Sequence, residues 1–180
     1  MRDLGAARCV PLVSASAALR ALPPATRYVL RGGSEVRAAA ESALGFGIPA
    51  TACRATVEGD RAALWLGPDE WLLIGPPPPS GFAAGLAEAL EGLAHSLVDV
   101  SHRQSALAVS GPQATTLLAA GCALDLDASA FPVGMCTRTM LAKAEIVLWR
   151  TEPQVFRLEV WRSFVAYVSQ FLGEAAREII

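Results

Sequence analysis

The sequence has few charged residues and almost no lysine. Among its 180 residues, only 18% are Asp, Glu, Lys or Arg, and Lys143 is the single lysine. The 15 basic and 17 acidic residues leave a net charge of −2. A nucleic-acid surface normally needs Lys and Arg clustered on one face to meet the phosphates. The composition therefore predicts no nucleic-acid partner.

Long apolar runs are also absent, although 53% of the residues are hydrophobic. No stretch approaches the roughly 18 uninterrupted apolar residues that span a bilayer. Near the start, the apolar stretch at 9–22 is interrupted by Pro11, Ser14, Ser16 and Arg20, which is untypical of a secretory signal. We therefore expect a cytoplasmic protein with no membrane partner.

The cysteines show neither a C-x-x-C pair nor a metal-like spacing with the two histidines, His95 and His102. They are far apart, at Cys9, Cys53, Cys122 and Cys136. Free cysteine is among the residues most often buried in protein cores. We interpret all four as buried free thiols and predict no metal site.

Common catalytic and nucleotide-binding motifs are missing. The sequence has no P-loop, no G-x-S-x-G nucleophile elbow and no H-E-x-x-H pair. Residues 45–50 match G-x-G-x-x-A, but a dinucleotide site needs this pattern between a strand and a helix. Here the pattern follows a predicted helix, and Pro49 falls where the next helix would begin. The sequence therefore predicts a chain with no catalytic set and no cofactor of its own.

Hydrophobic spacing and turn residues predict the same order of elements twice. Ser34 is expected to cap the first helix and Gly45 to end it. The expected elements of the first half are a strand at 27–31, a helix at 34–44, strands at 51–58, 62–66 and 71–75, and a helix at 82–93. Those of the second half are strands at 97–101 and 105–110, a helix ending at Gly121, strands at 137–142, 145–150 and 155–161, and a terminal helix capped by Ser163.

This repeated order predicts an α+β fold made of two related β-α-β-β-β-α halves with mostly antiparallel sheet. A faint sequence repeat supports it, because Tyr28–Ser34 aligns with Leu107–Gln113. Two copies with so long a period exclude a solenoid. We place the first half, with an N-terminal extension, at 1–94 and the second half at 95–180, packed together as one compact domain.

One polar cluster, Asp99-Val-Ser-His-Arg103, lies at a predicted strand end. Its carboxylate, hydroxyl, imidazole and guanidinium could support acid and base chemistry. Strand alternation, however, puts Asp99 and Ser101 on one face and His102 on the other. The favoured alternative is that Asp99 and Ser101 turn the chain, while His102 and Arg103 bind a neighbouring surface.

A second cluster is the acidic pair Asp125 and Asp127. The two carboxylates could ligate a hard cation, but Ca²⁺ and Mg²⁺ sites usually recruit further oxygen ligands. The apolar residues nearby do not supply them. We therefore interpret the pair as the start of a loop.

The tryptophans all fall in predicted strands, at Trp65, Trp71, Trp149 and Trp161. A stacking platform for nucleic-acid bases would need a basic groove beside them, which the sequence lacks. Packing in the core or at an interface is the favoured role.

Several segments resemble the folate-binding aminomethyltransferase superfamily. They are Asp99-Val-Ser-His-Arg103, Val109-Ser-Gly-Pro-Gln-Ala114, Asp125-Leu-Asp127, Phe131-Pro-Val-Gly134 and Cys136-Thr-Arg-Thr-Met-Leu-Ala142. Within that superfamily, the stretch from Asp125 to Arg150 is similar to the gamma subunits of heterotetrameric sarcosine oxidases. The length near 180 residues agrees, and the resemblance covers most of the chain.

The resemblance includes one informative departure. Active aminomethyltransferases carry an acidic turn of the type Asn-Glu-x-Gly-Gly-x-x-Asp-Asp, whose aspartate handles the aminomethyl transfer. The corresponding place here reads Leu141-Ala-Lys-Ala-Glu-Ile-Val147, which is shorter and lacks the aspartates. The resemblance therefore implies a fold kept without its chemistry.

In function, the resemblance implies a noncatalytic gamma subunit of a complex that oxidatively demethylates sarcosine to glycine and passes the one-carbon unit to tetrahydrofolate. It implies no cofactor on this chain, with FAD, FMN, NAD and tetrahydrofolate on the alpha, beta and delta partner subunits. Polar residues at predicted turns and strand ends are our candidates to face a partner or a ligand. They are Asp99, His102, Arg103, Arg138 and Arg162.

Two other functions stay open at the level of the sequence. One is a stand-alone folate-dependent one-carbon transferase with Asp99, His102 and Glu145 as its acid and base groups. The other is a folate- or carboxylate-binding module. In that module Arg103 and Arg138 would hold carboxylates, because guanidinium groups bind them in a bidentate way.

Overall fold

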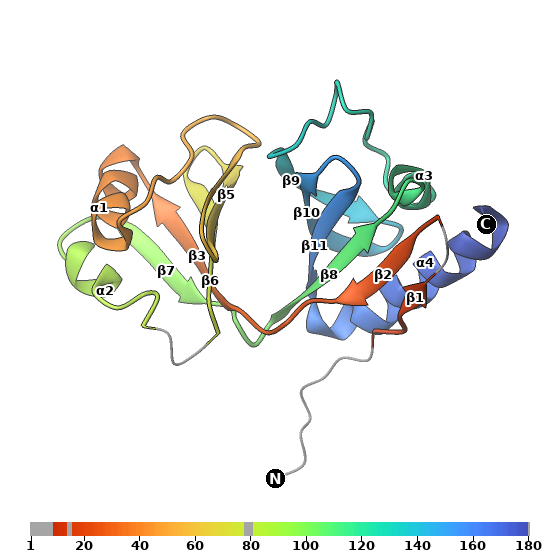
Figure 1. The fold of residues 1–180 in the computed structure, drawn as a ribbon. Helices are drawn as coiled ribbons and strands as arrows, with labels where there is room; N and C mark the ends of the chain where they lie inside the picture. Colours follow the sequence, from red (N-terminus) through yellow and green to blue (C-terminus); the bar gives the residue numbers. More distant parts are fainter. Residues whose placement is uncertain (1–8, 14–15, 78–80, 180) are drawn as a thin grey trace, which may run out of the picture. The chain divides into compact units, whose positions relative to one another are not determined.

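The computed structural model describes residues 9–13, 16–77 and 81–179, and the chain divides into two compact units. Unit 1 comprises residues up to 23 together with 103–133 and 138–180, whereas unit 2 comprises 24–102 and 134–137. Each unit is built on one sheet (Figure 1). The fold is α+β with two antiparallel sheets, in agreement with the predicted class.

Unit 2 contains a five-stranded sheet. In spatial order its strands are β4 (Ala55–Glu58), β5 (Arg61–Gly67), β6 (Glu70–Gly75), β3 (Thr26–Gly32) and β7 (His95–Asp99). Two helices, α1 (Ser34–Leu44) and α2 (Leu86–Ala89), complete the unit. Leu30 and Leu73 from the sheet pack in one core with Val36 of α1 and Leu86 of α2. Burial of this apolar face is the main force that holds the unit together.

Helix α1 forms where the sequence predicts it, because Val36, Ala40 and Leu44 recur at helical spacing and are all buried. It ends at Gly45, whose φ of 69° is a left-handed conformation that glycine adopts without strain. The start differs from the prediction. Gly33 is the N-cap residue, Ser34 is already helical, and no side chain caps the helix.

Unit 1 contains a six-stranded sheet. Its spatial order is β1 (Leu12–Val13), β2 (Ala18–Ala21), β8 (Gln104–Ser110), β11 (Val155–Trp161), β10 (Ala144–Glu152) and β9 (Cys136–Leu141). The helices are α3 (Ala114–Ala119) and α4 (Val165–Ile179), with a 3₁₀ turn, η1 (Arg162–Phe164), before α4. Strands β8 and β11 pair along their whole length, from Ser110 opposite Val155 to Gln104 opposite Trp161.

Helix α4 is the longest helix in the described part of the chain. It buries Val165, Val168, Leu172 and Ala176 on one face, at the spacing expected of an amphipathic helix. Ser163 lies inside η1 and does not cap α4 as predicted. Among the described helices, none combines the length and apolarity that a membrane crossing requires.

The two sheets exchange strands along the chain. Strand β2 precedes β3 in the sequence but pairs with β8 in unit 1. Strand β7 precedes β8 but pairs with β3 in unit 2 (Figure 1). The predicted boundary between residues 94 and 95 therefore falls inside unit 2, just before β7.

Some elements are shorter than predicted. Helix α2 has only four residues, because Gly85 before it has a φ of 83° and Gly92 after it a φ of 79°, both outside helical geometry. Strand β4 begins at Ala55 and not at residue 51. Strands β1 and β2 were not among the predicted elements.

Candidate functional site

The end of β7 and the turn that follows it contain three of the predicted site residues, Asp99, His102 and Arg103. The backbone N–H of Ser101 donates to Asp99 Oδ1 at 2.8 Å. The backbone N–H of Arg27 on β3 donates to Ser101 Oγ at 2.8 Å, and the N–H of Val100 donates to the carbonyl of Arg27 at 2.9 Å. Asp99 and Ser101 therefore close a turn that is hydrogen-bonded to the neighbouring strand.

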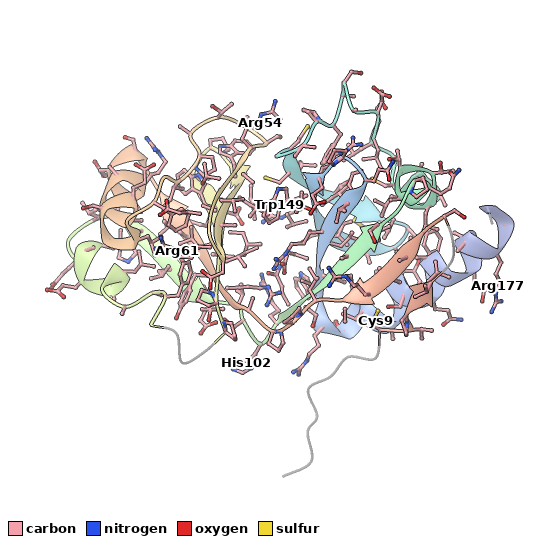
Figure 2. The ribbon with its side chains drawn as sticks, viewed as in Figure 1. Cys9, Arg54, Arg61, His102, Trp149 and Arg177 are labelled. Carbon is pink, nitrogen blue, oxygen red and sulfur yellow. The ribbon has the colours of Figure 1, made fainter. Side chains whose placement is uncertain are left out.

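These contacts also fix the charge of Asp99. Hydrogen bonds from Ser101, first from its side chain and then from its backbone, hold the pKa of the Asp99 carboxyl below its usual value, and His102 adds a small Coulombic contribution. Asp99 is thus an ionised acceptor within a turn. A carboxylate in this state is a poor proton donor at neutral pH, which argues against the acid and base reading. His102 lies exposed beside it (Figure 2).

Arg103 and Arg162 lie together on unit 1. The N–H of Arg162 donates to the carbonyl of Arg103 at 2.8 Å, because β8 and β11 pair up to this point. The guanidinium carbon of Arg103 lies 5.0 Å from the ring centre of Trp161, a cation–π contact. Both arginines are exposed. Pairing of the two strands therefore brings together two candidate residues that are far apart in the sequence.

Arg138 lies elsewhere in the same unit. Its Nε is 4.0 Å from Glu145 Oε1, and both side chains are substantially exposed, so this ion pair contributes little to stability. Strands β11 and β10 separate β8 from β9, so the sheet does not bring Arg103 and Arg138 together. The geometry gives no support to a carboxylate site that both arginines share.

The acidic pair at 125–127 serves the local backbone. Asp125 Oδ1 accepts from the N–H of Asp127 at 2.9 Å, and Asp127 Oδ1 accepts from the N–H of Ser129 at 2.8 Å. These are successive turns of the loop-start type that the sequence favours. Within the described residues, no group of three or more His, Cys, Asp or Glu is arranged to hold a metal ion.

Two features escaped the sequence analysis: the buried arginine Arg150, and the ion pair of the half-buried Arg157 with a buried glutamate. Arg150 is 6% exposed, and its guanidinium donates to the carbonyls of Leu126, Phe131 and Pro153. Arg157 Nη2 lies 2.7 Å from Glu159 Oε1, and the Glu159 side chain is fully buried. An arginine in a strand is normally read as facing solvent, so neither feature carries a sequence signal.

The cysteines include one thiol with a strongly shifted pKa. Burial raises the pKa of Cys136 to about 12, and its Sγ lies 3.6 Å from the carbonyl oxygen of Trp65. Cys122 is also buried, but Cys9 and Cys53 are only half-buried, so the prediction of four buried thiols is wrong for two of them.

We expect Cys136 to resist alkylation in the folded protein. At pH 8, a thiol with a pKa of about 12 is thiolate in about one molecule in 10,000, compared with roughly one in four at the ordinary pKa of 8.5. Iodoacetamide labelling followed by peptide mass spectrometry should show Cys136 reacting at least a hundredfold slower in the native protein than in urea. Equal labelling rates in the two conditions would contradict the burial of this thiol.

Sequence comparison places most of the chain in one family. The model of the sarcosine oxidase gamma subunit family matches residues 32–178. A sarcosine oxidase subunit gamma from Arthrobacter sp. is 39% identical over 164 residues, which cover 89% of this chain and 80% of the relative. The sarcosine oxidase subunit gamma from Corynebacterium sp. strain P-1 is 37% identical over 164 residues, which also cover 89% of this chain and 80% of the relative.

Structural comparison agrees. A chain of the heterotetrameric sarcosine oxidase from Corynebacterium sp. U-96, solved in complex with pyrrole 2-carboxylate, superposes with a TM-score of 0.86 at 31% identity, covering 93% of this chain and 88% of that one. The glycine cleavage system aminomethyltransferase T from Bartonella henselae superposes with a TM-score of 0.65 at 14% identity, covering 88% of this chain and 45% of that one, and so shares the fold. By sequence and structure alike, this chain belongs to the sarcosine oxidase gamma subunit family.

Proposed function

We propose that this chain is a noncatalytic gamma subunit of a heterotetrameric sarcosine oxidase. In this role it supports a complex that demethylates sarcosine oxidatively to glycine and passes the one-carbon unit to tetrahydrofolate. The observation that carries the proposal is the match to the gamma subunit family over residues 32–178. The high structural similarity to a chain of a solved heterotetramer supports the assembly.

The local geometry favours a noncatalytic role. Aminomethyl transfer needs an acidic group at the turn between β9 and β10, and that turn here is formed by Ala142 and Lys143. Ala142 has a φ of 51°, the left-handed conformation of a tight turn, and neither turn residue is acidic. Glu145 is engaged with Arg138, and Asp99 is held in a turn. The residues present do not fit the chemistry that the fold family performs on folate.

We further propose that FAD, FMN, NAD and tetrahydrofolate are bound by the alpha, beta and delta subunits and not by this chain. The only dinucleotide-like pattern, at 45–50, supports this. Its first glycine ends α1 in a left-handed conformation, so the pattern follows a helix and does not lead from a strand into one. The backbone N–H groups of a helix N-terminus, which would hold a pyrophosphate, are therefore not placed there.

The two halves of the chain are proposed to be structurally related. The order β3, α1, β4, β5, β6, α2 in the first half has a counterpart in β8, α3, β9, β10, β11, α4. The sheet orders also correspond, because β4-β5-β6-β3-β7 parallels β9-β10-β11-β8-β2. Strand β7 pairs with β3 and directly precedes β8 in the chain. In the same way, strand β2 pairs with β8 and directly precedes β3.

Co-expression tests the proposed function. When an affinity tag is placed on this chain and the alpha, beta and delta subunits are produced with it, we expect a stoichiometric four-chain complex that oxidises sarcosine. The chain purified alone should show no turnover and no heat of binding in calorimetry with tetrahydrofolate. Purification of the tagged chain as a monomer beside an assembled alpha, beta and delta complex would contradict the proposal.

A further inference from the structure

An exposed aromatic cluster lies where β11 passes into α4. Trp161 is 41% exposed and Phe164 is 38% exposed, although large aromatic side chains usually contribute to a core. Trp161 is the last residue of β11, and Phe164 is the last residue of η1, the single 3₁₀ turn that separates the strand from the helix. With the exposed Arg103 and Arg162, these residues form a single surface, which we call the Trp161 patch.

The Trp161 patch is held rigidly by the residues beneath it. The ring of Phe164 contacts Tyr167 edge to face at a centroid distance of 6.4 Å, and Tyr167 stacks on Phe171 at 6.5 Å. Arg103 lies over Trp161, and the hydrogen bond from Arg162 to Arg103 fixes the two backbones. A surface that is already ordered loses little conformational entropy when a partner binds.

The charges of the patch are unbalanced. Within the described residues, Arg103 and Arg162 form no ion pair with a carboxylate. Six other arginines do, namely Arg31, Arg37, Arg61, Arg138, Arg157 and Arg177. Exposed arginines beside exposed Trp and Phe are the composition typical of the energetic centre of a protein interface. They are complementary to a surface with carboxylates around an apolar side chain.

We infer that the Trp161 patch docks an acidic segment of another subunit, in which carboxylates pair with Arg103 and Arg162 and an apolar side chain packs on Trp161 and Phe164. This inference rests on the proposed function, since it needs an assembly to dock into. It goes beyond that proposal in naming the surface and the chemistry of its partner. A second copy of this chain is the competing occupant.

The test uses the co-expressed four-chain complex, purified through a tag on a partner subunit. We expect Arg162→Glu and, separately, Trp161→Ala to lower the amount of this chain recovered in the complex at least tenfold. Arg177→Glu is the matched control. It makes the same charge change on an exposed arginine at the other end of α4 (Figure 2), and it should leave recovery unchanged. Recovery of the wild-type chain should also fall as the salt concentration rises.

The outcomes separate this inference from the proposed function. Absence of the wild-type chain from the complex overturns both. Recovery of wild type, Arg162→Glu and Trp161→Ala in equal amounts overturns the inference alone. Sedimentation of the isolated chain completes the test, because dimers that Trp161→Ala dissolves would show that a second copy occupies the patch. Circular dichroism of each variant alone identifies any loss that is due to misfolding, and Arg162→Gln then replaces the affected variant.

Discussion

Replacement of Arg150 by Met is expected to lower the free energy of unfolding by roughly 3 to 5 kcal/mol. The Arg150 guanidinium is buried and donates to Phe131 at 2.9 Å, to Leu126 at 3.2 Å and to Pro153 from two of its nitrogens. Methionine keeps much of the apolar stem but leaves these three carbonyl groups without their donor. An unsatisfied buried acceptor costs about 1 to 3 kcal/mol.

The Arg150→Met change also removes a ring contact, since the Arg150 guanidinium lies 5.0 Å from the ring centre of Phe156. Urea unfolding followed by circular dichroism measures the loss. Arg138→Met is the matched control, because Arg138 is 39% exposed and its ion pair with the exposed Glu145 spans 4.0 Å, so we expect a change within about 0.5 kcal/mol. A loss below about 1 kcal/mol for Arg150→Met would mean that water or other donors replace the guanidinium.

Local sequence signals predicted the elements whose structure depends on local chemistry. Helix α1 follows from three apolar residues at helical spacing and a terminal glycine, and both signals act within one segment. The turn at Asp99 follows from the short side chains of Asp99 and Ser101, which hydrogen-bond to the nearby backbone. Helix α2 was predicted too long because apolar spacing alone does not register the left-handed φ of Gly85.

Features that depend on distant pairing could not be predicted in this way. An apolar strand pattern says that a segment pairs, but not with which strand, so the exchange of β2 and β7 between sheets has no local signature. The same limit hid the contact of Arg103 with Trp161, which exists only because β8 pairs with β11. Arg150 was missed for a different reason. A charged residue in a strand is expected to face solvent, but the guanidinium of Arg150 is buried and donates to three backbone carbonyls.

The family assignment depended on different information. The segments from Asp99 to Arg150 resemble the sarcosine oxidase gamma subunit family, and both the family model and the structural superposition confirm that resemblance. Neither hydrophobic periodicity nor charge specifies this identity, because many unrelated proteins share an α+β fold with similar composition. The residues alone indicate that the common catalytic motifs are missing. The family resemblance, by contrast, indicates the kind of complex to which the chain belongs.

The exchanged strand β2 gives the second large prediction, because its junction with β8 depends on a glycine. Gly111 follows directly after β8 and has a φ of 112°, and a Cβ added there would lie 2.6 Å from the carbonyl oxygen of Ser16 and 3.0 Å from the Cα of Ala17. Both contacts are with backbone, so no side chain can move away to relieve them. We expect Gly111→Ala to lower the free energy of unfolding by roughly 2 to 4 kcal/mol, from backbone strain and from overpacking.

The loss should concentrate at β2, because the backbone that carries the clash leads directly into that strand. Hydrogen exchange of Gly111→Ala should show amides of Ala18–Ala21 losing protection before those of β11. Gly173→Ala is the control in the same unit, since a Cβ at Gly173 meets nothing within 4 Å and alanine favours the helical conformation of α4. That variant should gain about 0.5 to 1 kcal/mol. If Gly111→Ala unfolds at the same urea concentration as wild type, the contact of β2 with the end of β8 is not the close backbone approach described.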